Sequence, residues 1–114
     1  MNWEHAATKT PQIVPYSSSM PYIWEPGTAM FISAKTPKMH PLINTVGRSP
    51  SIEHTIELLN TAYNDWKFNS GKGIAKIADS AYNMVMSEKY SWKTISKTFS
   101  DIFMEVLDDN DSVA

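Results

Sequence analysis

The pattern of apolar and polar residues divides the chain into two unlike halves. All seven prolines, from Pro11 to Pro50, lie in the first fifty residues, and proline breaks the interior of a helix. This half therefore predicts strands and loops, with short apolar strands at residues 12–16 and 29–33 that are bounded by turn residues. We expect a short helical turn at residues 21–24 and an ordered but irregular loop at residues 35–51.

From Ser51 onward the apolar residues recur at helical spacing, in three successive stripes. The stripes are Ile52, Ile56, Leu59, Tyr63 and Trp66; Ile74, Ile77, Ala78, Ala81 and Val85; and Trp92, Ile95, Phe99, Ile102 and Val106. Ser51 or Ser49 suits the N-cap of the first helix and Ser91 that of the last, while "NSGKG" at residues 69–73 is a helix–helix turn. Each stripe needs a core to cover it, so we expect Trp92, Phe99, Met84 and Met86 to be core residues.

The start of the chain reads as the last turn of a helix, a tight turn and a strand. The order is then a helix end, two strands separated by a loop, and three helices, which indicates an α/β fold with two short parallel strands. Sheets usually hold about four to six strands. We therefore expect residues 1–107 to be the C-terminal half of a larger Rossmann-like domain, followed by a polar tail at residues 108–114.

Composition narrows the class of protein. The chain has 114 residues, 42% of them hydrophobic, with four tryptophans, which is a globular composition and not a disordered one. The absence of cysteine excludes disulfides and fits a reducing compartment, so we expect a cytoplasmic protein. The sequence has no apolar run long enough to cross a membrane and no secretory leader. The net charge of −2 comes without a basic patch, which argues against nucleic acid as a partner.

Three candidate chemical sites have better structural explanations. Glu53, His54 and Glu57 lie near one another on a helix, but a catalytic zinc needs three converging ligands, and a solvated helix face is the better interpretation. The serines at 17–19 lack the glycine elbow of a nucleophile. Gly-Lys-Gly at 71–73 lacks the spacing of a phosphate-binding loop. We therefore predict no catalytic residue and no metal ligand.

Several segments in order resemble a known family. Residues 3–24, "WEHAATKTPQIVPYSSSMPYIW", resemble the second half of the donor-binding motif of retaining glycosyltransferases of the GT-B type, family 4. "AMFISAK" at 29–35 is similar to the next strand of that family, and "HPLINTVGRSPSIEHTIELLNTAY" at 40–63 to its following loop and helix. "MSEKYSWKTISKTFSDIFMEVL" at 86–107 is similar to the closing helices. The resemblance covers residues 3–107.

The resemblance implies a Rossmann-like GT-B domain and transfer of a sugar, a hexose, from a nucleotide diphosphate sugar to an acceptor hydroxyl. It implies no metal and no cofactor besides this donor substrate. Glu4 matches the second glutamate of the family's pair, which hydrogen-bonds the ribose hydroxyls. Ser17 and Ser18 match the loop that borders the donor cleft. Without the resemblance, Glu4 is an ordinary first-turn glutamate.

The departures from the family decide what the chain is expected to do. The first glutamate of the pair would precede Glu4 by eight residues, before the start of this sequence, together with the glycine-rich turn that holds the diphosphate. The usual Pro-Glu is here Pro21-Tyr22. We therefore expect a segment that is inactive alone and needs a missing N-terminal part or a partner chain. The alternatives are a non-catalytic binding or assembly module derived from a glycosyltransferase, and an unrelated α+β domain.

Overall fold

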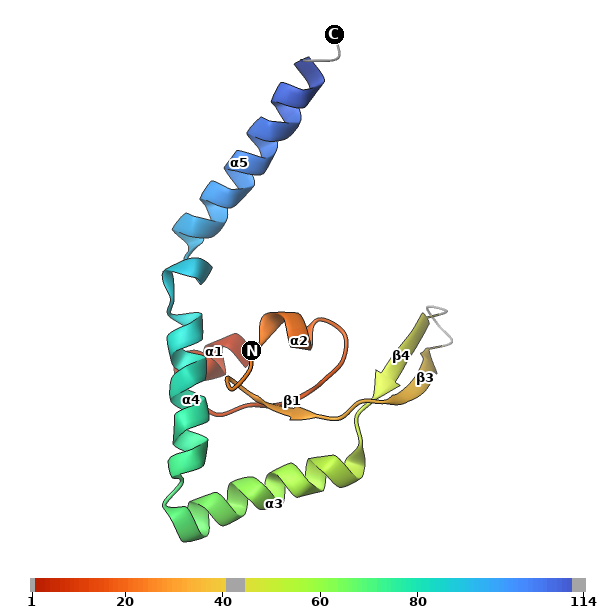
Figure 1. Cartoon of the computed structure of the whole chain (residues 1–114), viewed down its shortest axis with the longest axis vertical. Coiled ribbons are helices and arrows are strands. Elements are labelled where there is room, and N and C mark those ends of the chain that lie inside the picture. The colour runs from red at the N-terminus through yellow and green to blue at the C-terminus, as the bar shows by residue number, and fades with distance from the viewer. Residues whose placement is uncertain (1, 41–44, 112–114) are drawn as a thin grey trace.

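The computed structural model describes residues 2–40 and 45–111 and is mixed α/β, with helices predominating. The elements, in chain order, are α1 (Asn2–Ala7), β1 (Ile13–Pro15), α2 (Met20–Ile23), β2 (Met30–Ile32), β3 (Thr36–His40), β4 (Thr45–Ser49), α3 (Ile52–Asn69), α4 (Lys72–Val85), the 3₁₀ turn η1 (Glu88–Tyr90) and α5 (Trp92–Asp111) (Figure 1). The helical segments of the second half lie where the apolar spacing predicts them. No helix within the described ranges is both long and apolar enough to cross a bilayer.

The two short apolar strands pair in parallel, as the sequence predicts. Ile13 lies opposite Met30 and Pro15 opposite Ile32. The Met30 N–H donates to the Gln12 carbonyl over 2.9 Å, and the Tyr16 N–H donates to the Ile32 carbonyl over 2.8 Å. The fold class is therefore confirmed at the level of a parallel strand pair among helices.

The outer edges of this pair differ from each other. In a parallel ladder alternate residues face each side, so Ile13 and Pro15 of β1 face away from β2. Pro15 has no N–H, and its carbonyl accepts from the Ser17 N–H over 2.9 Å. On β2 the far edge ends at Ser33, whose N–H donates to His54 Nδ1 over 2.8 Å and whose carbonyl accepts from the Ser51 N–H over 2.7 Å. The start of α3 thus binds the end of the β2 edge at Ser33, and no such bond is present at Ile13 on the β1 edge among the described residues.

The prediction of an irregular loop at residues 35–51 is wrong, because a β-hairpin occupies most of this segment. β3 and β4 pair antiparallel, with Thr36 opposite Ser49 and Lys38 opposite Gly47. The segment from Thr36 to Met39 is exposed, so no alternation of apolar and polar residues marks these strands in the sequence. The part of the loop prediction at residues 41–44 lies outside the described residues.

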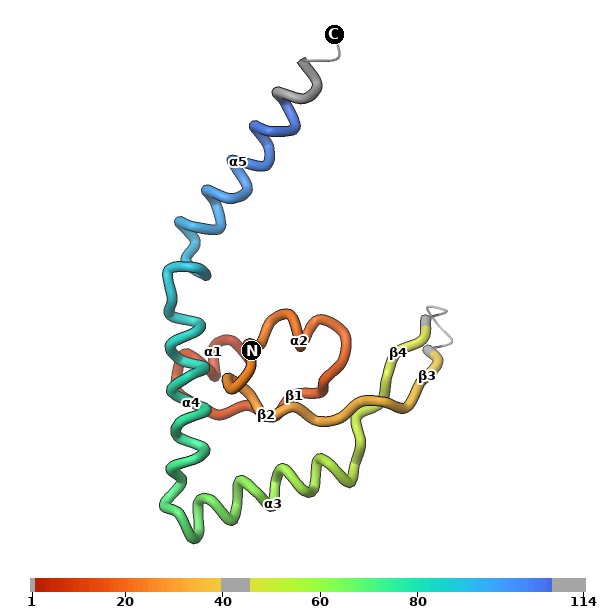
Figure 2. The backbone as a smooth tube through the Cα atoms, in the orientation of Figure 1, coloured from red at the N-terminus to blue at the C-terminus, as the bar shows by residue number. Residues whose placement is uncertain are grey.

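A small core forms where α1 and α4 meet the parallel strands (Figure 2). Its buried residues are Ala6, Val14, Trp24, Ala29, Ala81, Met84 and Val85, with Trp3, Met20, Phe31 and Tyr90 packed against them. The stripe of α4 is therefore covered as predicted. Met84 is buried as expected, whereas the same prediction for Met86 is wrong, because that side chain is exposed.

The stripes of α3 and α5 are exposed, which corrects the prediction that they are core. Trp92 is 85% and Phe99 58% exposed, and on α3 the side chains from Ile52 to Trp66 also face solvent. α5 contacts η1 and projects away from the rest of the chain (Figure 1). The radius of gyration is 19.2 Å, whereas a compact chain of this length has about 13 Å. Two apolar surfaces are therefore left without a cover.

Candidate functional site

Glu4 lies in the first turn of α1 and is exposed. The helix is fixed by its neighbours, since Ala6 is fully buried and the Trp3 ring packs against two aromatic side chains. The Trp3 and Trp24 ring centroids are 6.0 Å apart, and those of Trp3 and Tyr90 are 5.1 Å apart with the rings nearly perpendicular. The first turn of α1 is thereby held beside the segment that follows α2.

Ser17 and Ser18 form a tight turn directly after β1. The Met20 N–H donates to the Ser17 carbonyl over 3.2 Å. Ser17 is half-buried and Ser18 exposed, and Ser18 has a left-handed backbone with φ of 53°. Such a conformation costs a non-glycine residue about 1 kcal/mol or more. Ligands of open α/β sheets bind at the carboxyl ends of the strands, which is where this strained turn lies.

The contact between Trp3 and Trp24 is the link that the structure shows between the two parts of the predicted site. It joins the N-terminal turn of α1, which carries Glu4, to the segment that continues the Ser17–Ser18 turn. Two pockets, of about 150 and 160 Å³, are lined by residues other than Glu4, Ser17 and Ser18.

Lys89 and Lys9 are each paired with a carboxylate. Lys89 Nζ lies 2.9 Å from Glu25 Oε1, and Lys9 Nζ lies 2.9 Å from Asp79 Oδ1. The hydrogen bond with Lys89 lowers the pKa of the Glu25 carboxyl, and the same bond raises the pKa of Lys89. These pairs tie α1 to α4 and η1 to the segment after α2, so they have a structural role.

Sequence reasoning missed the roles of His54 and Asp65. His54 Nδ1 accepts a hydrogen bond from the Ser33 N–H at the end of β2. The role of His54 is therefore to bind this strand, and not to form part of an acidic helix face. Asp65 accepts from the N–H groups of Gly73 and Ile74 over 3.2 and 2.9 Å and thereby caps α4 from the preceding helix. The Ile74 N–H is the main reason that the Asp65 pKa is lowered. The sequence signal for this cap is Gly71 at the N-cap position of α4. Because glycine has no side chain, it cannot cap the helix itself, and another residue has to do so.

Among the residues that the structure describes, no group of three or more His, Cys, Asp or Glu side chains converges to hold a metal ion. Comparison of the chain with protein-family models, with curated proteins and with solved structures found no match. The resemblance to GT-B glycosyltransferases therefore remains a prediction from the sequence.

Proposed function

We propose that this chain is the C-terminal half of the donor-binding domain of a retaining GT-B glycosyltransferase. The observation that carries the proposal is the parallel β1–β2 pair among helices, with the Ser17–Ser18 turn directly after β1 and Glu4 in α1, the helix that precedes this strand. The donor would be a nucleotide diphosphate sugar and the acceptor a hydroxyl group. The reducing compartment that fits a cysteine-free chain is the cytoplasm.

Glu4 would bind the ribose of the donor. A carboxylate accepts hydrogen bonds only, so it takes two hydroxyl donors at once, as a ribose offers. Ser17 and Ser18 would border the sugar from the turn after β1. Departure of the diphosphate needs positioned cationic or amide groups, and Lys9 and Lys89 are paired with Asp79 and Glu25. We therefore propose that the chain alone does not turn over and that the diphosphate is held by a further segment.

The large accessible surface of the chain supports the proposal that a further segment packs against it. The accessible surface is 8853 Å², whereas a folded monomer of 12.9 kDa exposes about 6,300 Å². The excess of about 2,500 Å² has the size of a large obligate interface. The open edge of β1 at Ile13 and the exposed stripe of α3 flank the parallel pair. They suit a βα unit supplied by the missing part of the domain or by a partner chain.

The alternative is a non-catalytic binding or assembly module that derives from such an enzyme. The exposed apolar stripe of α3 favours it, because such a patch is typical of a protein-interaction site. The two functions differ in their ligand. The glycosyltransferase segment binds a nucleotide-sugar through Glu4, and the module does not.

Two-dimensional ¹⁵N NMR of the whole chain with UDP- and GDP-sugars tests the proposal. We expect shifts confined to the first turn of α1 and the Ser17–Ser18 turn, which disappear in Glu4→Gln and persist in Glu57→Gln, a control on the exposed face of α3. Shifts that survive Glu4→Gln, or no shifts at millimolar donor, contradict donor binding and favour the module. Release of sugar above a Glu4→Ala control would contradict the lack of turnover.

The native gene offers a second, independent test. An in-frame continuation upstream, with a glycine-rich turn and a glutamate eight residues before Glu4, supports the enzyme segment. A stop codon and a promoter in the same place support the stand-alone module.

A further inference from the structure

The β3–β4 hairpin is a two-stranded sheet that no other described element completes. The extensive contacts of β3 and β4 are with each other, and the hairpin projects from the start of α3 away from α4 (Figure 1). Met39 and Val46, which lie opposite each other, are both exposed. A pair of strands by itself is only marginally stable in water, and a third strand stabilises it. The hairpin is therefore a sheet to which one more strand can be added.

The two outer edges of the hairpin differ in their backbone groups. Alternate pairs of an antiparallel ladder exchange two hydrogen bonds, and the pairs between them point their N–H and C=O groups outward. Pro37 lies opposite Arg48 and has no N–H, so this pair is not one that exchanges two bonds. Pro37 and Met39 therefore face the outer edge of β3, and Val46 and Arg48 face the outer edge of β4.

The edge of β4 is the one that suits an added strand. Proline blunts a strand edge, and Pro37 leaves the edge of β3 with the Met39 N–H as its outward donor. On β4 both outward residues, Val46 and Arg48, have an N–H group. No group of the described residues bonds with their outward N–H and C=O groups. Two donors and two acceptors are thus available along β4.

The charge of the hairpin indicates the chemistry of the strand that it binds. Residues 26–52 contain Lys35, Lys38 and Arg48 and no acidic residue, whereas the whole chain has a net charge of −2. These three cations are exposed, and none of them is paired with a carboxylate of the described residues. Because like charges on adjacent strands are destabilising, this excess of positive charge disfavours a second copy of the hairpin and favours an acidic segment.

Two of the cations are placed to contact an added strand. Arg48 lies on β4 itself, on the same face of the hairpin as Val46. Lys38 lies opposite Gly47 on the other face, and Gly47 has no side chain to separate Lys38 from a strand beside β4. An acidic residue next to Arg48, or next to Gly47, is therefore within reach of a cation, and an apolar residue next to Val46 covers its exposed side chain.

We infer that the edge of β4 binds an extended acidic segment of another protein as a third strand. The main chain of the segment bonds with the outward groups of Val46 and Arg48, which provides affinity, and its side chains alternate between the two faces, which provides specificity. The inference does not rest on the proposed function, because the hairpin contains none of the residues proposed to bind the donor.

Two-dimensional ¹⁵N NMR of the whole chain with two short peptides tests the inference. One ten-residue peptide alternates valine and glutamate, and its control has lysine in place of each glutamate. We expect the acidic peptide to shift the amide signals of Val46, Gly47 and Arg48 and the basic peptide to leave them unchanged. Shifts of the same size with both peptides, or no shifts at millimolar concentration, overturn the inference.

Proline substitutions on the two edges form a matched pair. Val46→Pro removes an outward N–H from β4, and we expect it to weaken the binding by on the order of fivefold or more, since one hydrogen bond to the added strand is lost. Met39→Pro removes the opposite N–H from β3 and should leave the binding unchanged. Nuclear Overhauser effects between Lys38 and Gly47 verify that the hairpin persists in both variants. A loss that is no larger in Val46→Pro than in Met39→Pro overturns the inference.

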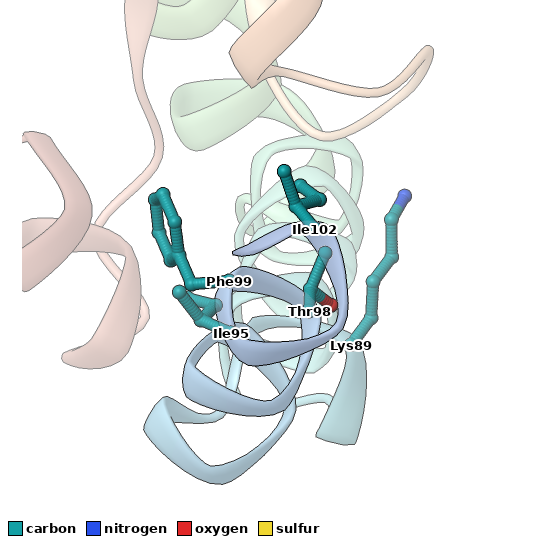
Figure 3. A pocket seen from close by; sticks show the side chains of 5 residues that line it. All are labelled: Lys89, Ile95, Thr98, Phe99 and Ile102. Atoms are coloured by element: carbon teal, nitrogen blue, oxygen red, sulfur yellow. The ribbon is translucent and has the colours of Figure 1, made fainter. Parts of the chain in front are cut away.

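Charge reversal and two competing modes of binding complete the test. Arg48→Glu should weaken the binding by on the order of fivefold or more, whereas Lys93→Glu, at an exposed lysine of α5, should not; equal effects overturn the inference. A DNA duplex of about ten base pairs carries charge without a strand, and equal shifts with it overturn the inference. The pocket of about 150 Å³ on α5 is another place for an apolar side chain of the peptide. Figure 3 shows Ile95, Phe99 and Ile102 lining it, and shifts confined to these residues likewise overturn the inference.

Discussion

Replacement of Trp24 measures how much of the stability depends on the small core. Trp24 is 2% exposed and packs against Trp3 with the ring centroids 6.0 Å apart. Its indole Nε1 finds no hydrogen-bond acceptor in the part of the chain that the structure describes. The side chain therefore contributes through its apolar area, while its buried N–H group lowers the stability.

Two substitutions separate these contributions. Trp24→Ala removes the whole ring and leaves a cavity, and we expect it to cost about 3–5 kcal/mol. Trp24→Phe loses about 40 Å² of buried area, or about 1 kcal/mol. It also removes a donor without an acceptor, which recovers about 1–3 kcal/mol. The balance of the two terms runs from no change to a gain of about 2 kcal/mol in stability.

Urea unfolding followed by far-ultraviolet circular dichroism gives both values, because the helices provide the signal in every variant. Tyr22→Ala is the control, since this neighbouring aromatic residue is 90% exposed and its loss should change the free energy of unfolding by less than about 0.5 kcal/mol. If Trp24→Ala costs no more than Tyr22→Ala, the reasoning about the core is wrong. If Trp24→Phe costs as much as Trp24→Ala, the unpaired N–H has no energetic role.

Three further predictions concern the joints between elements. Because the pKa of Asp65 is lowered in the folded state, its stabilising effect is present above its unfolded pKa and is lost as the pH falls through the folded one. Asp65→Asn should thus lower the melting temperature near neutral pH and flatten its decline in acid, whereas an unchanged decline would contradict the cap. His54→Ala removes the acceptor of the Ser33 N–H and should cost about 1–2 kcal/mol in urea unfolding, and no loss would show that this bond is dispensable. Ser70 has φ of 53°, so Ser70→Gly should raise stability by up to about 1 kcal/mol and Gly71→Ala should lower it; the opposite signs would contradict the left-handed turn.

Several local features could be predicted from the sequence because each depends on neighbouring residues. The cap of α3 by Ser51, whose Oγ accepts the His54 N–H over 3.2 Å, follows from residue type and position. The cap of α5 by Ser91, whose Oγ accepts the Thr94 N–H over 3.1 Å, follows in the same way. Proline spacing likewise restricted the first half to strands and turns. The candidate residues Glu4, Ser17 and Ser18 came from the resemblance, whereas the packing of Trp3 against Trp24 came from the tertiary structure.

Other features depend on contacts between distant residues. The β3–β4 hairpin pairs exposed segments without apolar alternation, so its register has no sequence signal. The His54–Ser33 bond spans 21 residues and the second bond from Asp65 spans nine, beyond the reach of helical periodicity.

The sequence by itself determined where the helices of the second half lie and which face of each is apolar, because both follow from residues within one or two turns. It did not determine which apolar face is covered. The three stripes have the same period, yet only that of α4 is buried, against α1 and the strands. Burial needs a second surface of matching shape, and only the tertiary structure showed that the described residues provide none for the stripes of α3 and α5, although α3 itself packs against α4 and β2.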